Sequence, residues 1–192
     1  PVGLSWLEID THDAPSLALI RRDAPCPIAS GETLCERRDF KPFLEQYAMD
    51  VAIIDTPWNG VWQSMKIAAA AEACEVNVTP HNFYGHLCTM MNAHFSAAVP
   101  NLRIMETDID RIAWDHELFD QVPEFIDGHL LVPDRPGGLI PDPPGPTAGA
   151  GWGRPGGTLK LQIQRSSPSY GLAQRRIVWR LRIFSSGIHL PM

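Results

Sequence analysis

The strongest constraint on the fold of this chain is a regular alternation of two kinds of segment between residues 5 and 107. Short apolar segments rich in β-branched residues, which are typical of strands, alternate with longer segments that have a helical pattern. The unit repeats about every two dozen residues, and no GxGxxG sequence occurs within these units. Such even βα units form a parallel sheet, and their spacing favours a (β/α) barrel over a dinucleotide-binding fold.

The pattern predicts five strands and four helices. The segment 50–55 is the clearest strand, because a continuous apolar run suits a parallel strand that is covered on both faces. Thr11 or Asp13 is a suitable N-cap for the first helix, and Pro42 is expected near the start of the second, where proline is tolerated. The predicted strands are 5–9, 27–30, 50–55, 76–81 and 101–107, and the predicted helices are 11–23, 37–49, 61–74 and 83–99, with a turn at 56–60.

The chain is too short for a complete barrel of this kind, which has eight units and about 250 residues. With 192 residues and five predicted strands, we expect a partial (β/α) barrel. The sequence is then either the C-terminal part of a longer chain or an incomplete protein. Its hydrophobic content of 44% is sufficient for a buried core.

The composition changes near residue 140. Asp142 is the last acidic residue, and the sequence that follows is basic and rich in Gly, Pro and Ser. We assign residues 1–140 to the barrel and residues 141–192 to a tail with three interpretations. The tail is a disordered extension, a small β-module, or sequence read in the wrong frame, and the loss of every acidic residue favours the last. In the β-module interpretation, strands are expected near 159–164 and 176–184.

The charge and the cysteines restrict the partners and the compartment. The net charge of −6 argues against nucleic acid or an anionic membrane as a partner. No apolar run approaches the roughly 20 residues of a membrane span, and the first residues lack the layout of a signal peptide. The cysteines are scattered without a CxxC pair, which is typical of reduced thiols. We therefore expect a cytoplasmic protein.

A titratable residue stands at the end of each predicted strand: Glu8, Glu32, Asp55, His81 and Glu106. In a parallel barrel, the carboxyl ends of the strands meet at one mouth, which is the catalytic face. Glu8 and Glu32 form a hard oxygen site suited to Mg²⁺, with a third ligand expected from the preceding strand. Asp55 beside His81 allows the histidine to act as a general base. Glu106, across the mouth, can hydrogen-bond an oxyanion, if protonated, or the distal atoms of a substrate.

Each of these residues also has a structural interpretation. An acidic residue after a strand is commonly a helix N-cap or a solvated loop residue. His86 and His94, on the helix after His81, are expected to be packing or surface residues. The functional interpretation depends on the occurrence of five such residues at nearly equal spacing, one at each successive strand end.

Five short segments resemble the C-terminal barrel of the enolase superfamily, in its mandelate racemase/muconate lactonizing enzyme family. The resemblance covers about residues 4–138, and the segments occur in the order and spacing of that family. Each segment contains one of the strand-end residues. The segments are WLE at 6–8, PIASGE at 27–32, DVAIIDTPWNG at 50–60, VTPHNFYGH at 78–86 and RIMETD at 103–108.

The resemblance implies a role for each strand-end residue. Glu8 and Glu32 correspond to the second and third magnesium ligands, Asp55 and His81 to a His–Asp dyad, and Glu106 to the acid that meets the substrate carboxylate. The N-terminal capping domain, the first three barrel strands, the first metal ligand and a lysine base have no counterpart in this sequence. Asp10 replaces the usual proline after the fourth barrel strand, so it is only a weak site candidate.

The reaction implied by the resemblance is abstraction of the proton α to a carboxylate, with Mg²⁺ stabilising the enediolate. The polar residues Asn82, Tyr84 and His86 beside the dyad are weak substrate-binding candidates and favour a polyhydroxylated acid. We therefore predict an acid-sugar dehydratase that acts on a small carboxylate. A 2-hydroxy-acid racemase or epimerase is the alternative, and a third interpretation is that these 192 residues are inactive alone. The resemblance also implies a homo-oligomer for the full-length protein.

Overall fold

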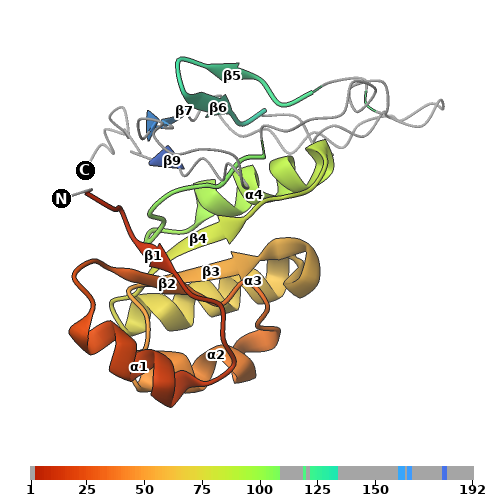
Figure 1. The fold of residues 1–192 in the computed structure, drawn as a ribbon. Helices are drawn as coiled ribbons and strands as arrows, with labels where there is room; N and C mark the ends of the chain where they lie inside the picture. Colours follow the sequence, from red (N-terminus) through yellow and green to blue (C-terminus); the bar gives the residue numbers. More distant parts are fainter. Residues whose placement is uncertain are drawn as a thin grey trace, which may run out of the picture.

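The computed structural model describes residues 3–108, 119, 122–133, 160–162, 164–165 and 179–180. Its main part is a parallel sheet with the strand order β1-β2-β3-β4, in which each helix follows a strand (Figure 1). The predicted α/β class and parallel sheet are confirmed, while closure into a barrel stays a prediction. The elements are β1 (Leu7–Glu8), α1 (Ala14–Asp23), β2 (Ile28–Ser30), α2 (Glu36–Glu45), β3 (Val51–Asp55), α3 (Thr56–Ala73), β4 (Asn77–His81) and α4 (His86–Ala98).

Strand β3 is buried on both of its faces, as its continuous apolar run predicts. Ala52 and Ile54 pack into the main core together with side chains of all four helices. Val51 and Ile53 pack on the opposite face in a smaller cluster. Because side chains alternate along a strand, Asp55 lies on the same face as Val51 and Ile53, away from the helices.

The predicted strand at 101–107 is wrong as a continuous strand. A single parallel bridge joins Val78 of β4 to Leu102, and the Val78 N–H donates to the carbonyl of Asn101 at 2.9 Å. The next residue of β4 whose nitrogen points to the same side is Pro80, which has no N–H. The ladder therefore stops after one bridge, although the segment runs beside β4 in the predicted order.

The helix boundaries differ from the prediction where particular residues start or stop a helix. Helix α1 begins at Ala14, because Asp13 is its N-cap and accepts a hydrogen bond from the Ser16 N–H at 3.2 Å. Helix α2 ends at Glu45, since Tyr47 has a φ of 50°. Pro42 lies inside this helix and not near its start, where the sequence predicts it. The predicted turn at 56–60 is the first turn of α3, which is kinked at Gly60.

Shorter strands follow the main sheet. Residues of β5 (Phe125–Ile126), β6 (His129–Leu131) and β7 (Lys160–Gln162) pair in an antiparallel sheet, and β8 (Gln164–Arg165) pairs with β9 (Trp179–Arg180). Strands β7 to β9 lie at or near the two tail segments for which strands are predicted. The boundary at residue 140 and the three interpretations of the tail stay predictions, because most of residues 141–192 lie outside the described residues.

Two further observations concern membrane spans and cysteines. No helix among them is both long enough and apolar enough to span a membrane. All four cysteines are free thiols, namely Cys26, Cys35, Cys74 and Cys88. The reduced state and the cytoplasmic location predicted from their spacing stay predictions.

Asp50, which precedes β3, connects three elements of the sheet and its helices. Its Oδ1 accepts hydrogen bonds from Nε and Nη2 of Arg21 in α1, at 3.0 and 2.7 Å. Its Oδ2 accepts from the backbone N–H of Ile28 in β2 at 2.8 Å. Burial alone would raise the pKa of Asp50, but the bonds from Arg21 and Ile28, with the charges of Arg21 and Arg103, lower the pKa below its usual value.

We expect Asp50→Asn to lower the free energy of unfolding by about 1–3 kcal/mol at neutral pH, because charge-assisted hydrogen bonds are lost. A depressed folded-state pKa means that this stabilisation is complete above the unfolded-state pKa of about 3.9 and is lost as the pH falls through the lower folded-state value. Urea unfolding of both proteins at pH 7 and at decreasing pH measures the difference. Asp23→Asn, at an exposed position, is the control. A difference that is constant down to acid pH would contradict the assignment.

Candidate active site

The centre of the site is a buried pair at the carboxyl ends of two neighbouring strands. Asp55 ends β3, His81 ends β4, and the two residues are register partners. Their exposed fractions are 1% and 8%, and Nδ1 of His81 lies 2.9 Å from Oδ2 of Asp55. A carboxylate can only accept a hydrogen bond, so Nδ1 carries the proton and Nε2 keeps its lone pair. The structure thus brings together the two residues of the predicted dyad.

The second ring nitrogen of His81 has the properties of a base. Nε2 is buried and has no hydrogen-bond partner among the described residues, and Oε2 of Glu32 lies 3.7 Å away. Burial lowers the pKa of His81, but the hydrogen bond to Asp55 and the negative charges of Glu106 and Glu32 outweigh it and raise the pKa above its usual value. The nitrogen that accepts a proton therefore lies on the side of the site where Glu32 stands.

Asp55 has two roles, one for each of its carboxylate oxygens. Oδ1 accepts the backbone N–H of Trp58 at 3.0 Å, so Asp55 is the N-cap of α3. Oδ2 accepts from His81 and also from the hydroxyl of Tyr84, at 2.7 Å. The helix-cap interpretation and the dyad interpretation of this residue are therefore compatible. Tyr84, a predicted substrate contact, directs its hydroxyl to Asp55.

Glu106 is attached to the residue that follows His81. Its Oε2 accepts the backbone N–H of Asn82 at 3.0 Å, and the side-chain amide of Asn82 donates to the carbonyl of Glu106 at 3.1 Å. The same amide donates to the hydroxyl of Thr89 at 3.2 Å, and Asn82 is fully buried. Asn82, predicted as a weak substrate contact, therefore connects Glu106 to β4 and α4.

The two predicted metal ligands lie at or just after the ends of neighbouring parallel strands. Glu8 is the last residue of β1, and Glu32 follows the end of β2. Their carboxylates are hard oxygen donors, which suit Mg²⁺, and this ion is commonly bound by one or two carboxylates together with substrate and water. No group of three or more His, Cys, Asp or Glu side chains in the described part of the chain forms a metal site by itself. The chemistry of these two donors fits a magnesium site that further ligands would have to complete.

The remaining weak candidates lie at the edges of the site. Asp10 is exposed and accepts hydrogen bonds from the Thr33 hydroxyl at 3.0 and 3.1 Å, which links the loops after β1 and β2. The ring of His86 makes an edge contact with Phe119 at a centroid distance of 5.4 Å. His94 is exposed, as predicted. The contacts of Asp10 and His86 thus give both residues a structural role.

Sequence reasoning missed Asn92, a buried residue in α4 that connects both strands of the dyad. The hydroxyl of Thr56, which follows Asp55, donates to Oδ1 of Asn92, and Nδ2 of Asn92 donates to the carbonyl of His81 at 2.8 Å. A signal was available, because polar residues recur at helical spacing on the buried face of α4. These residues are Thr89, Asn92 and Ser96.

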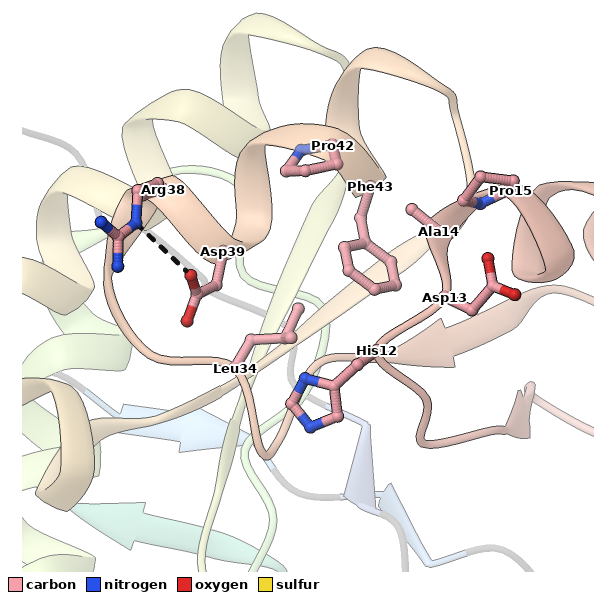
Figure 2. A pocket seen from close by; sticks show the side chains of 9 residues that line it. All are labelled: His12, Asp13, Ala14, Pro15, Leu34, Arg38, Asp39, Pro42 and Phe43. Carbon is pink, nitrogen blue, oxygen red and sulfur yellow. Dashed lines mark ion pairs between the residues drawn. The ribbon is translucent and has the colours of Figure 1, made fainter.

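A separate pocket of about 400 Å³ lies between the start of α1 and one side of α2 (Figure 2). No strand-end residue of the candidate site lines it, so it is distinct from the Asp55–His81 pair. The ion pair between Arg38 and Asp39, at 3.8 Å, lies on its α2 side. Its lining residues are His12, Asp13, Ala14, Pro15, Leu34, Arg38, Asp39, Pro42 and Phe43.

Comparison with known proteins gives a family and several relatives. Residues 1–140 match the model of a family described as enolase C-terminal domain-like. Among solved structures, the chain is similar to a "putative L-alanine-DL-glutamate epimerase" from Burkholderia xenovorans strain LB400, bound to magnesium and fumarate. The sequences are 64% identical with a TM-score of 0.68, over 69% of this chain and 33% of the other.

Two curated relatives are named as dehydratases. The chain is 29% identical over 137 residues to D-xylonate dehydratase of Haloferax volcanii, covering 69% of this chain and 33% of the relative. It is 29% identical over 138 residues to arabinonate dehydratase of Saccharolobus solfataricus, covering 71% of this chain and 35% of the relative. The chain thus spans about a third of the length of each of these three proteins.

The family match extends over most of the chain and includes all five strand-end residues. It agrees with the parallel order of β1 to β4 and with the buried pair at the ends of β3 and β4. The chain therefore belongs to the enolase C-terminal domain-like family, within the enolase superfamily.

Proposed function

We propose that this chain is the proton-abstracting part of a Mg²⁺-dependent enzyme that dehydrates an acid sugar. The observation that carries the proposal is the buried pair of Asp55 and His81, with 2.9 Å between Oδ2 and Nδ1. The proton on Nδ1 leaves the lone pair of Nε2 to accept the proton α to the substrate carboxylate. The raised pKa of His81 supports this role, because a stronger base removes a weakly acidic proton more readily.

Glu8 and Glu32 are proposed to hold the magnesium ion, together with ligands from outside the described residues. The bound ion supplies electrostatic stabilisation of the negative charge that develops on the substrate carboxylate. Glu106 is proposed to contact that carboxylate as an acid. Its bond from the Asn82 N–H fixes one oxygen beside the end of β4.

Dehydration is the first candidate because His81 can serve both of its proton transfers. One histidine can take the α-proton and then protonate the departing β-hydroxyl. The polar residues beside the dyad, Asn82, Tyr84 and His86, also favour a polyhydroxylated acid. The xylonate and arabinonate dehydratases among the relatives support an acid-sugar substrate, a small carboxylate.

Epimerisation is the second candidate, and the 64% identity to the Burkholderia xenovorans protein favours it. The first half of the reaction is the same, because an epimerase also removes the α-proton. A second base would then return a proton to the other face. The 2-hydroxy-acid racemase predicted from the sequence belongs to this class of reaction. A homo-oligomeric parent protein and a cytoplasmic location complete the proposal.

The test is α-proton exchange by the purified protein in D₂O with Mg²⁺. The compounds are D-xylonate, arabinonate, other pentonates and hexonates, mandelate, and the dipeptide of L-alanine and L-glutamate. We expect deuterium at the α-carbon and a 2-keto-3-deoxy acid from one of the acid sugars, with loss of both products on chelation of the metal. His81→Asn is expected to abolish both products.

The outcomes separate the two candidates. Exchange with inversion but without a keto acid would replace the dehydratase by the epimerase or racemase. His94→Asn, at an exposed position on α4, is the matched control and is expected to keep full activity. If no compound exchanges its α-proton, these 192 residues are inactive alone, which is the third interpretation of the sequence.

A further inference from the structure

Oδ2 of Asp55 accepts hydrogen bonds from two side chains at once. Nδ1 of His81 lies at 2.9 Å and the hydroxyl of Tyr84 at 2.7 Å. The Tyr84 ring also meets the His81 ring edge-on, with centroids 5.7 Å apart and an interplanar angle of 85°. We propose that Tyr84 is a positioning residue, which acts on His81 through Asp55 and does not bind the substrate through its hydroxyl.

The Asp55 carboxylate is held at both oxygens by groups of three different kinds. The backbone N–H of Trp58 holds Oδ1, and His81 and Tyr84 hold Oδ2. With 1% of its surface exposed, Asp55 cannot replace a lost donor by bulk water. Removal of the Tyr84 hydroxyl therefore leaves the carboxylate freer to rotate, and the imidazole bonded to it loses its fixed direction.

The shared oxygen also weakens the bond to His81. A second donor draws electron density from Oδ2, so the hydrogen bond to Nδ1 is weaker than a bond to an unshared carboxylate. Burial and the hydrogen bond to Asp55 raise the pKa of the Tyr84 hydroxyl. The hydroxyl therefore stays protonated and acts as the donor. Tyr84, Asp55 and His81 form one continuous chain of hydrogen bonds.

This inference rests on the proposed proton abstraction by His81, and it predicts a distinct kinetic effect. A residue that contacts substrate contributes to binding, so its loss raises KM. A positioning residue affects the step in which His81 takes the proton, so its loss lowers kcat and leaves KM unchanged. Without the Tyr84 hydroxyl, the stronger bond to Asp55 makes His81 more basic. This does not offset the loss of its fixed direction, because proton transfer requires a short and aligned contact.

Tyr84→Phe removes the hydroxyl and keeps the ring, and Tyr47→Phe, at an exposed position in the turn after α2, is the matched control. Both variants are measured with D-xylonate and arabinonate in the exchange and dehydration assay. We expect kcat to fall about tenfold for Tyr84→Phe, with KM within about twofold of the original value.

A proton NMR measurement tests the same inference without turnover. At one fixed pH, the Nδ1 proton of His81, assigned by its loss in His81→Asn, is expected to move downfield in Tyr84→Phe, because Oδ2 of Asp55 then bonds His81 alone. The Tyr47→Phe spectrum should not change. If no compound is turned over but the resonance moves, the proposed function fails and the positioning role stands. A raised KM with unchanged kcat, or an unmoved resonance, would overturn the inference.

Discussion

Asp55→Asn is expected to slow α-proton exchange by roughly 10³–10⁴-fold while the protein keeps its fold. The two side chains have nearly the same shape, so the effect arises from the replacement of one oxygen by an NH₂ group. The three donors around Asp55 decide which way the new amide turns. The Trp58 N–H belongs to the backbone and can only donate, so it must face the amide oxygen.

The NH₂ group of the new asparagine then faces His81 and Tyr84. Both of these partners can become acceptors, because an imidazole can change its tautomer and a hydroxyl can rotate. Nδ1 of His81 accepts, its proton moves to Nε2, and the lone pair that would take the substrate proton is lost. The new amide keeps a partner for its oxygen and for both of its N–H groups, which is why the variant is expected to fold.

Deuterium uptake at the α-carbon measures the loss of activity, and ¹⁵N chemical shifts of His81 report the tautomer. The control is Asp39→Asn, because Asp39 lies on α2 and pairs with its neighbour Arg38 at 3.8 Å, away from the dyad. It is expected to exchange at the original rate. If Asp55→Asn kept more than about a tenth of the activity, the pair would not act as a base and its orienting carboxylate.

Gly31→Ala is expected to be the most destabilising single substitution of a small residue near the site. Gly31 has a φ of +116°, a conformation that L-residues rarely adopt. A Cβ there would lie 2.9 Å from Cε1 of Phe40 and 3.0 Å from the carbonyl oxygen of Ile53. The backbone strain and the overlap together predict a loss of about 2–6 kcal/mol.

Gly60→Ala separates the two contributions. Gly60 also has a positive φ, +69°, but no heavy atom lies within 4 Å of the position that a Cβ would take, so the substitution adds strain without overlap. The expected cost is about 1–3 kcal/mol. Urea unfolding of the two variants gives the difference, which is the cost of the contact with Phe40 and Ile53. Equal costs at the two positions would show that the overlap relaxes freely.

The centre of the site could be predicted from the sequence because it depends on strand ends. A continuous apolar run identifies β3, and the parallel order of the strands then places Asp55 beside His81. The boundaries of α1 and α3 were less accurate, because a cap at Asp13 or a kink at Gly60 depends on local backbone angles. The type of an element can be predicted from its hydrophobic period alone, whereas the position of its ends depends on local hydrogen bonds.

The partners of polar side chains could not be predicted, because they depend on which segments meet in the folded chain. Tyr84 and Asn82 follow His81 closely, and their polar character suggested substrate contacts. In the structure Tyr84 turns back to Asp55, and Asn82 turns to Glu106. Pro80 is visible in the sequence, but whether its missing N–H interrupts the pairing of β4 with the segment 101–107 depends on which side of β4 faces that segment.

The strands that carry the site differ in length, and this gives its two halves unequal local stability. Asp55 and His81 close a ladder of five residue pairs, whereas Glu8 belongs to a strand of two residues, β1. Local opening of a two-residue ladder costs less free energy than opening of a five-residue ladder. The Asp55–His81 pair is therefore preorganised. In the proposed magnesium site, a cation that binds Glu8 would also have to order the segment that carries it, and the free energy spent on that ordering would lower the apparent affinity for the cation.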